Sequence, residues 1–197
     1  MTNEQADARA AFARRVDALR GRRVLAVDYW DLHTSGSDPD WDYGDWHHAV
    51  MGVQLTTGTG PVTVTWEATF HPYGVDVFLE PITRHLDEDE SQRVGPGAGS
   101  RWDAFLGQPI RAATARWDTL TLGPATRWDG EVVARPHDVH LPTALRLDFD
   151  PGPVWFVAGM PRFPQVDDVF IPGDEIMIVF TAAKMRAMGY ADPTFAT

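Results

Sequence analysis

The first 21 residues carry apolar side chains at helical spacing. Phe12, Val16 and Leu19 lie at positions i, i+4 and i+7, which places them on one face of a helix. Gly21 follows them, and glycine commonly ends a helix. We therefore predict an N-terminal helix over residues 1–21, with its apolar face packed against the rest of the protein.

From Val24 onward the apolar period changes to two, which is the spacing of a half-buried strand. This pattern predicts four strands, at residues 24–32, 47–57, 62–70 and 75–80. Alternate side chains of the second strand share one face: Ala49, Met51, Val53 and Leu55. Turn residues separate the last three strands, so we expect these strands to form an antiparallel meander with one buried face.

Residues 81–100 have the weakest pattern in the chain. They hold an acidic run at 87–90 and a stretch rich in glycine and proline at 94–100. We predict a mobile loop here, with one helical turn near residues 82–86. The sequence Ser100–Asp103 then favours a helix start, and Gly107 can close a short middle helix.

The second half of the chain again has strand patterns. It predicts strands at residues 110–122, 131–135, 144–150, 154–159 and 175–180. The last of these is continuously apolar from Ile176 to Phe180, which indicates a central strand covered on both faces. The segment Pro172–Glu175 before it indicates a tight turn whose carboxylates pair with a nearby arginine. Thr181 can cap a last short helix that Gly189 ends.

About nine strands, most of them linked by hairpins, lie between helices at the two ends of the chain. The pattern predicts one α+β domain over residues 1–197, with a mostly antiparallel sheet that is strongly curved or closed into a barrel and covered by a helix. Its predicted segments are an N-terminal helix (1–21), an acidic meander (22–80), a mobile loop (81–100) and a second set of strands with the short middle and C-terminal helices (101–197).

Composition narrows the class of protein. The chain has no cysteine, which excludes disulfides and thiolate metal sites. Its N-terminus is polar and rich in arginine, and no apolar stretch approaches the roughly 20 residues of a membrane span. We therefore expect a cytoplasmic protein with no membrane partner. The formal net charge of −11 also argues against binding to a nucleic-acid backbone, which requires basic groups.

Charge is unevenly distributed along the chain. Between Arg23 and Arg84 there is no lysine or arginine, and nine carboxylates lie in this stretch: Asp28, Asp31, Asp38, Asp40, Asp42, Asp45, Glu67, Asp76 and Glu80. Half of the eight tryptophans and four of the seven histidines lie there too. A negative field beside large aromatic surfaces favours a basic protein partner or a cationic ligand.

The densest part of this stretch is the segment 38–46, which supplies the candidate partner-binding residues: Asp38, Asp40, Trp41, Asp42, Tyr43, Asp45 and Trp46. One interpretation is a solvated turn between two strands. The other is a recognition loop that exposes its aromatic side chains among carboxylates. The aspartate spacing is also typical of a calcium loop, but Gly44 lies one position late and Ala49 replaces the bidentate glutamate. We expect no metal and no cofactor.

Histidines support a second hypothesis. Adjacent residues on a strand point to opposite faces, so His47 and His48 cannot bind one ion together. If His47 shares the apolar face of its strand, it points inward near His33 or Asp28 and becomes a candidate general base. His140 is the other candidate for an interior pocket. A buried polar pair without catalytic role, or a simply exposed histidine, is the competing interpretation.

No motif in the chain identifies a reaction. Our preferred hypothesis is a non-enzymatic acidic binding protein that captures a basic protein partner through segment 38–46, in the way that acidic inhibitors and immunity proteins act. The alternative is a small-molecule-binding barrel or a barrel enzyme with a pocket formed by histidine and carboxylate groups. A third hypothesis is a structural subunit that uses the aromatic segment as an oligomer interface.

Overall fold

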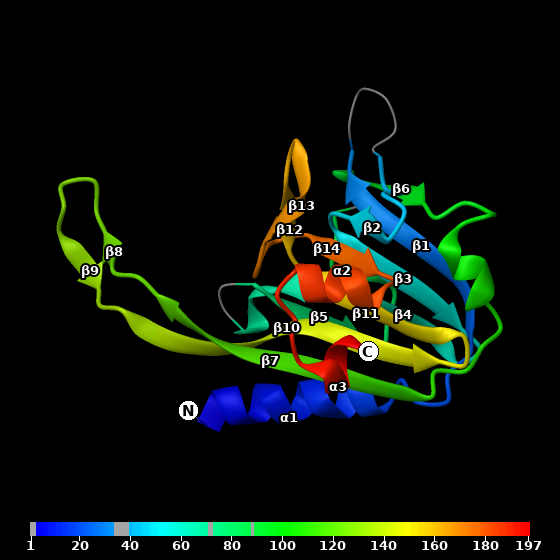
Figure 1. Cartoon of the computed structure of the whole chain (residues 1–197). Coiled ribbons are helices and arrows are strands. Elements are labelled where there is room, and N and C mark those ends of the chain that lie inside the picture. The colour runs from blue at the N-terminus through cyan, green and yellow to red at the C-terminus, as the bar shows by residue number, and fades with distance from the viewer. Residues whose placement is uncertain (1–2, 34–39, 71–72, 88) are drawn as a thin grey trace.

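Two five-stranded antiparallel sheets face each other and form most of the molecule (Figure 1). The computed structural model describes the whole chain except residues 1–2, 34–39, 71–72 and 88. Sheet 1 has the strand order β5 (Gly74–Phe78), β4 (Gly60–Glu67), β3 (Gly52–Thr57), β1 (Val24–Leu32) and β6 (Ser91–Gly95). Sheet 2 has the strand order β2 (Trp46–Ala49), β14 (Ile176–Val179), β11 (Gly152–Ala158), β10 (His137–Phe149) and β7 (Ala112–Leu122).

Short hairpins and helices complete the described fold. The hairpins are β8 (Ala125–Thr126) with β9 (Val132–Ala134), and β12 (Met160–Arg162) with β13 (Gln165–Phe170). The α-helices are α1 (Asn3–Asp17), α2 (Ala182–Ala187) and α3 (Pro193–Ala196), and the 3-10 helices are η1 (Ala68–Phe70), η2 (Ile82–Arg84) and η3 (Arg101–Ala104). No helix among the described residues is long and apolar enough to cross a bilayer.

Apolar side chains from both sheets fill the space between them. Leu55 and Val64 of sheet 1 and Leu145 and Phe156 of sheet 2 are fully buried in one cluster. The predicted apolar face of α1 joins this cluster through Phe12, and the helix packs against the edge strands β5 and β7. Burial of one such side chain contributes about 1.5–3 kcal/mol, so this cluster is the main source of stability.

The prediction of a single α+β domain with mostly antiparallel strands and helices at both ends is confirmed. The barrel alternative is wrong, because the described strands form separate sheets whose edges are β5 and β6 in sheet 1 and β2 and β7 in sheet 2. The described residues contain fourteen strands where the sequence predicted about nine. The N-terminal helix is also shorter than predicted and ends at Asp17.

Strand β14 is buried on both faces, as its continuous apolar run predicts. Ile176 and Ile178 belong to the core between the sheets. Met177 and Val179 point to the opposite side and pack in a second cluster beneath α2 and α3. The outer face of sheet 2 is therefore covered by the C-terminal helices, and this cover explains why β14 has no polar positions.

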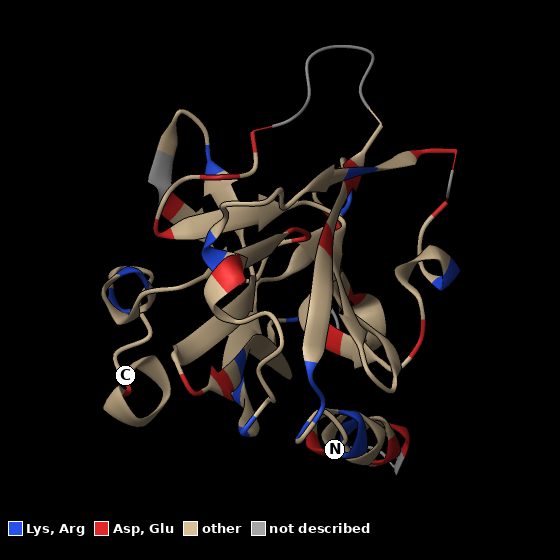
Figure 2. Ribbon diagram, turned by 90° about the vertical axis from the view of Figure 1, so that its right-hand side faces the viewer, with Lys and Arg blue, Asp and Glu red and all other residues tan. Residues whose placement is uncertain are grey.

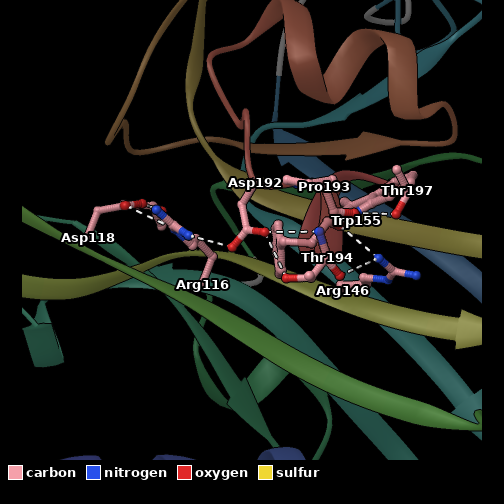
Figure 3. Close-up of polar contacts among 10 residues, drawn as sticks. Arg116, Asp118, Arg146, Trp155, Asp192, Pro193, Thr194 and Thr197 are labelled. Carbon is pink, nitrogen blue, oxygen red and sulfur yellow. Dashed lines mark hydrogen bonds and ion pairs between the residues drawn. The ribbon is translucent and has the colours of Figure 1, made fainter.

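The C-terminal segment is held on sheet 2 by hydrogen bonds (Figure 3). Asp192 caps α3 and also pairs with Arg116 of β7 at 3.2 Å. Arg146 and the Trp155 indole both donate to the carbonyl of Phe195, at 3.0 and 2.8 Å. The carbonyl of Phe195 has no partner within the helix, and these bonds satisfy it. Hydrogen bonds and apolar contacts therefore both hold the segment on sheet 2.

The strand predicted at residues 47–57 is two strands in different sheets. β2 ends at Ala49, which pairs with Ile176 in sheet 2, and β3 begins at Gly52 in sheet 1. Gly52 has φ +138°, and a Cβ at this position would lie 2.8 Å from the carbonyl oxygen of Val64. Only glycine fits this crossing. The apolar alternation continues through the break because both strands face the same core, and it therefore conceals the change of sheet.

Within residues 81–100, η2 confirms the predicted helical turn near residues 82–86, whereas the edge strand β6 lies where only a loop was predicted. β6 pairs with β1 and places Arg93 opposite Trp30. Its sequence lacks apolar alternation because most of its side chains are partly or fully exposed at the sheet edge. The middle helix is a single 3-10 turn, and the strand predicted at residues 62–70 ends at Glu67, where η1 follows.

Strands β7 and β10 continue beyond the body as a two-stranded extension that β8 and β9 close (Figure 1). We call residues 119–140 the arm. Trp128 lies in the turn at its tip and is 99% exposed, and Val132 and Val133 are 56% and 51% exposed. In the arm, the sequence predicted the end of the strand at residues 110–122 and a short strand at residues 131–135, but not the part of β10 before residue 144. The arm has no buried face to produce a longer apolar pattern.

Candidate functional site

The carboxylates of the acidic stretch differ in their partners. Four of them pair with arginines: Asp28 with Arg93 (3.0 Å), Asp45 with Arg101 (2.9 Å), Asp76 with Arg15 (2.6 Å) and Glu80 with Arg84 (3.9 Å). Asp38 lies outside the described residues. Figure 2 shows acidic and basic segments interspersed over one side of the molecule. Folding therefore balances much of the charge that is segregated along the sequence.

The aromatic residues of segment 38–46 are less exposed than the recognition-loop hypothesis requires. Trp46 is 2% exposed in the cluster beneath α2, so it offers no surface to a partner. Trp41 is half-buried, and its ring packs edge-on against Tyr29 and His47 with centroid separations of 5.8 and 5.0 Å. Tyr43 is half-buried and stacks on Trp46 at 4.4 Å. The expectation of three displayed aromatic side chains is wrong for Trp46.

The inner face of β2 carries a buried chain of hydrogen bonds. The Trp102 indole donates to the Tyr29 hydroxyl, and this hydroxyl lies 2.7 Å from Nδ1 of His47. An indole N–H can only donate, so the Tyr29 oxygen accepts from it and directs its own hydrogen to Nδ1. The neutral imidazole then holds its proton on Nε2, which faces Asp42 at 3.5 Å. We call Trp102, Tyr29 and His47 the buried relay.

Burial sets the protonation of the relay. It lowers the pKa of His47 to about 4, against a smaller opposing effect of Asp42, and it raises the pKa of Tyr29 well above its ordinary value. His47 does point inward, but its partner is Tyr29. Asp28 is bound to Arg93, whereas His33 and His140 are exposed. The four residues suggested for a catalytic pocket are therefore not brought together.

The outer face of β2 carries a different group. Nε2 of His48 donates to Glu175, with 2.7 Å between the nitrogen and Oε2. Phe163 of the β12–β13 turn is 58% exposed, and its ring lies 6.3 Å from the rings of both Tyr43 and His48. Asp31, at the end of β1, is 7% exposed beside them. We call this surface the acid–aromatic edge, formed by Asp31, Asp40, Tyr43, Phe163 and Glu175. Asp42 is not part of it, because its carboxylate lies 3.5 Å from Nε2 of His47 on the inner face of β2.

The acid–aromatic edge has an excess of negative charge. The pKa of Asp31 is raised mainly by burial, and the charge of Glu175 adds to this effect. The pKa of Tyr43 is raised first by burial and then by Asp40, Asp31 and Glu175. Within the described part of the chain, no arginine or lysine forms an ion pair with Asp31, Asp40 or Glu175. These carboxylates therefore differ from the arginine-paired ones.

Sequence reasoning missed Asp31, Phe163 and Glu175 as members of this surface. It placed Glu175 in a turn with an arginine partner, but the partner is His48, 127 positions away in the chain. The hairpin that presents Phe163 was not predicted at all. The one available signal was that His48 must face away from His47, which the structure bears out.

A separate pocket lies where the arm joins the body. It has a volume of about 340 Å³ and lies between α1, η1, β7 and β10. Trp117 forms its aromatic wall, with the Arg9 guanidinium 4.4 Å from the ring centroid and the His140 ring stacked at 5.3 Å. Phe70 packs edge-on against Trp117 at 5.0 Å. We call this the arm-root pocket, lined by Arg9, Phe70, Trp117 and His140.

Neither a metal site nor a similar protein is found for the described residues. Among the described residues, no group of three or more histidine, aspartate or glutamate side chains is arranged to hold a metal ion. The chain matches no protein-family model, no curated protein and no solved structure.

Proposed function

We propose that this chain is a non-enzymatic binding protein that captures a cationic side chain of a basic partner at the acid–aromatic edge. The observation that carries the proposal is the contrast between carboxylates that pair with an arginine and carboxylates that do not, among which the Glu175 carboxylate is bonded to His48 instead. Asp28, Asp45 and Asp76 are neutralised by arginines, whereas Asp40 and Glu175 lie beside an exposed phenylalanine without such a counter-ion in the described structure.

The chemistry of the edge suits a guanidinium or ammonium group. Two unit charges 4 Å apart interact by about 4 kcal/mol near a protein surface, before the cost of desolvation is subtracted. A cation over an aromatic face adds roughly 0.5–2 kcal/mol, and Tyr43 and Phe163 supply such rings next to Asp40 and Glu175. Burial is the main cause of the raised pKa of Asp31, and a bound cation would offset the smaller contribution of the Glu175 charge.

The structure gives less support to the alternative of a small-molecule-binding barrel or a barrel enzyme with a catalytic histidine. The two sheets are open, and the space between them is filled by apolar side chains. His47 is completely buried and already accepts a hydrogen bond from Tyr29, so a substrate has no route to it in this conformation.

Calorimetric titration with a nine-residue arginine peptide tests the proposal. We expect Asp40→Asn combined with Glu175→Gln to weaken binding at least tenfold, which corresponds to about 1.4 kcal/mol. The matched control is Glu4→Gln with Asp17→Asn, which removes the same charge from exposed positions of α1 and should change the dissociation constant less than about threefold. Equal losses in the two variants would mean that the peptide responds to net charge alone, and would overturn the proposal.

The aromatic part of the edge has its own control on the same hairpin. Phe163 and Phe170 are both exposed, at 58% and 47%, but only Phe163 lies against Tyr43. We expect Phe163→Leu to weaken binding of the peptide about threefold, because a cation–π contact is lost. Phe170→Leu should leave the affinity unchanged, and a reversed order of the two effects would contradict the assignment.

A further inference from the structure

The arm is an incomplete structural unit as it stands in one chain. Its strands are joined by ladder pairs from Thr119 to Leu122, and by side-chain bonds such as Thr121 to Asp138 at 2.6 Å. Figure 1 shows the arm extending away from the body, with no other described element beside its tip. A two-stranded ribbon with both faces in water is at best marginally stable, so this arm needs a surface to pack on.

The tip of the arm presents a large apolar group. Trp128 is 99% exposed and lies between Arg127 and Asp129, and the exposed Val132 and Val133 follow it. Arg127 pairs with Glu131 at 2.8 Å, so Asp129 supplies the remaining charge of the tip. Tryptophan is the residue type most enriched among those that dominate binding energy at interfaces. A tryptophan with nearly all of its surface in water, at the end of a projecting ribbon, is therefore suited to dock into a pocket.

The arm-root pocket is complementary to that tip. Its volume of about 340 Å³ lies in the range of pockets that hold small ring systems. Phe70 and Trp117 provide aromatic walls, for which edge-on and offset contacts with an indole are favourable. Arg9 is exposed at the same pocket, and its positive charge complements the negative charge of Asp129 at the tip.

Geometry assigns the tip and the pocket to different molecules. About ten residues separate the tip from His140 at the root, which at ~3.3 Å per residue places them roughly 30 Å apart along an extended ribbon. The arm therefore cannot fill its own pocket while its strands stay paired. In a pair of chains related by a two-fold axis, each tip can reach the other root over the same distance, and the two arms then lie antiparallel.

We propose that the occupant of the arm-root pocket is Trp128 of a second copy of this chain, so that two arms clasp each other in a symmetric dimer. Asp129 of one copy then faces Arg9 of the other. An arm of about 20 residues on each side is comparable to a standard protein interface. This inference uses surfaces separate from the acid–aromatic edge, so it can stand or fail independently of the proposed cation binding.

Light scattering coupled to size-exclusion chromatography gives the first test. We expect the wild-type chain to be a dimer, and Trp128→Ser to raise the dimer dissociation constant at least tenfold. Leu25→Ser removes an apolar side chain that is 53% exposed elsewhere on the body and should leave the dimer intact. A wild-type monomer throughout the micromolar range, or a dimer indifferent to Trp128→Ser, would overturn the proposal.

Charge reversal identifies which surfaces meet. Arg9→Glu and Asp129→Arg should each weaken the dimer at least fivefold, whereas the two changes together should restore most of the affinity because the pair is re-formed with opposite orientation. Arg20→Glu reverses an exposed charge on the segment that follows α1 and serves as the matched control. Additive losses in the double variant would show that Arg9 and Asp129 do not face each other.

Cross-linking provides an independent measurement. The chain has no cysteine, so Thr69→Cys at the pocket and Asp129→Cys at the tip introduce single thiols. We expect a disulfide-linked pair to form mainly when the two variants are mixed, and less when either is oxidised alone. Equal yields in all three samples would indicate random collision and would count against the clasp.

Discussion

The two faces of β2 place neighbouring histidines in opposite surroundings. His47 is buried in the relay with Tyr29 and Trp102, where every partner comes from the protein and the imidazole is kept neutral. His48 lies on the other side beside Glu175 at the acid–aromatic edge, where negative charge exceeds positive charge. The thickness of one strand separates these two regions.

This difference assigns the inner face of β2 to stability and leaves its outer face for the proposed binding role. The relay satisfies the Trp102 indole, the Tyr29 hydroxyl and Nδ1 of His47, so loss of a member leaves a buried donor or acceptor without a partner. Nε2 of His47 has no hydrogen-bond partner among the described residues and lies 3.5 Å from Asp42. At the edge, Asp40 is exposed and Glu175 is partly exposed, so each contributes little to folding and, under the proposed function, remains available to a ligand. We therefore expect mutations on the inner face to change stability and mutations on the outer face to change binding.

Truncation of the relay should give the largest effect. Trp102 is 1% exposed, so Trp102→Ala should lower the free energy of unfolding by about 3–5 kcal/mol through the cavity it leaves. Urea denaturation measures this change. Trp128→Ala removes the same side chain from a fully exposed position and should alter stability by less than about 0.5 kcal/mol at a protein concentration that keeps the chain monomeric. Similar losses at the two positions would remove the distinction between buried and displayed tryptophans.

A fall in pH should give the second-largest loss of folding stability, through protonation of His47. The folded pKa of His47 is about 4, below the 6.5 expected for an unfolded chain. The unfolded state therefore takes up the proton first, so the stability due to neutral His47 is complete above pH 6.5 and is lost as pH falls toward 4. The loss amounts to about 3 kcal/mol. Protonation also makes both ring nitrogens donors, and Nδ1 can then no longer accept from Tyr29.

Comparison of variants isolates this contribution. His47→Gln should show a smaller loss of stability than wild type between pH 6.5 and 4.5, measured by urea midpoints. His48→Gln should leave the His47-dependent loss in place, because His48 lies on the opposite face of β2 from the relay. If His48→Gln flattened the curve and His47→Gln did not, the assignment of the two faces would be reversed.

The smallest effect on stability should come from the edge. Glu175 is about 20% exposed, so Glu175→Gln should change the free energy of unfolding by less than about 1 kcal/mol while it reduces binding of a cationic peptide. Thermal and urea denaturation measure the free energy of unfolding, and the calorimetric titration described above measures the affinity for the peptide, both on the same preparation. A loss above about 2 kcal/mol would mean that the His48–Glu175 bond belongs to the structural core.

The parts of the fold that follow from sequence are those with one buried face. β1 has its predicted bounds, Val24–Leu32, and Val24, Val27 and Tyr29 face the core between the sheets. The continuous apolar run of β14 correctly indicated cover on both sides. Elements without a buried face, such as β6 and the arm, leave no apolar pattern and were missed or shortened.

The candidate site was less accessible to sequence reasoning for a different reason. Charge counted along the chain cannot show that Asp45 meets Arg101 or that Asp76 meets Arg15, since these pairs join distant segments. Composition likewise cannot distinguish Trp46, which is buried, from Trp128, which is exposed. The acid–aromatic edge became visible only after the paired carboxylates had been identified.

The crossing at Gly52 has a consequence for the order in which the molecule assembles during synthesis. All strands of sheet 1 lie within residues 24–95, whereas β2 must pair with a strand 127 positions later. At typical translation rates this interval lasts roughly 6–25 seconds. A nascent chain can thus form sheet 1 early. The segment from Trp46 to Ala49 stays unpaired until the last strand has been synthesised, and its pairing then joins the two sheets.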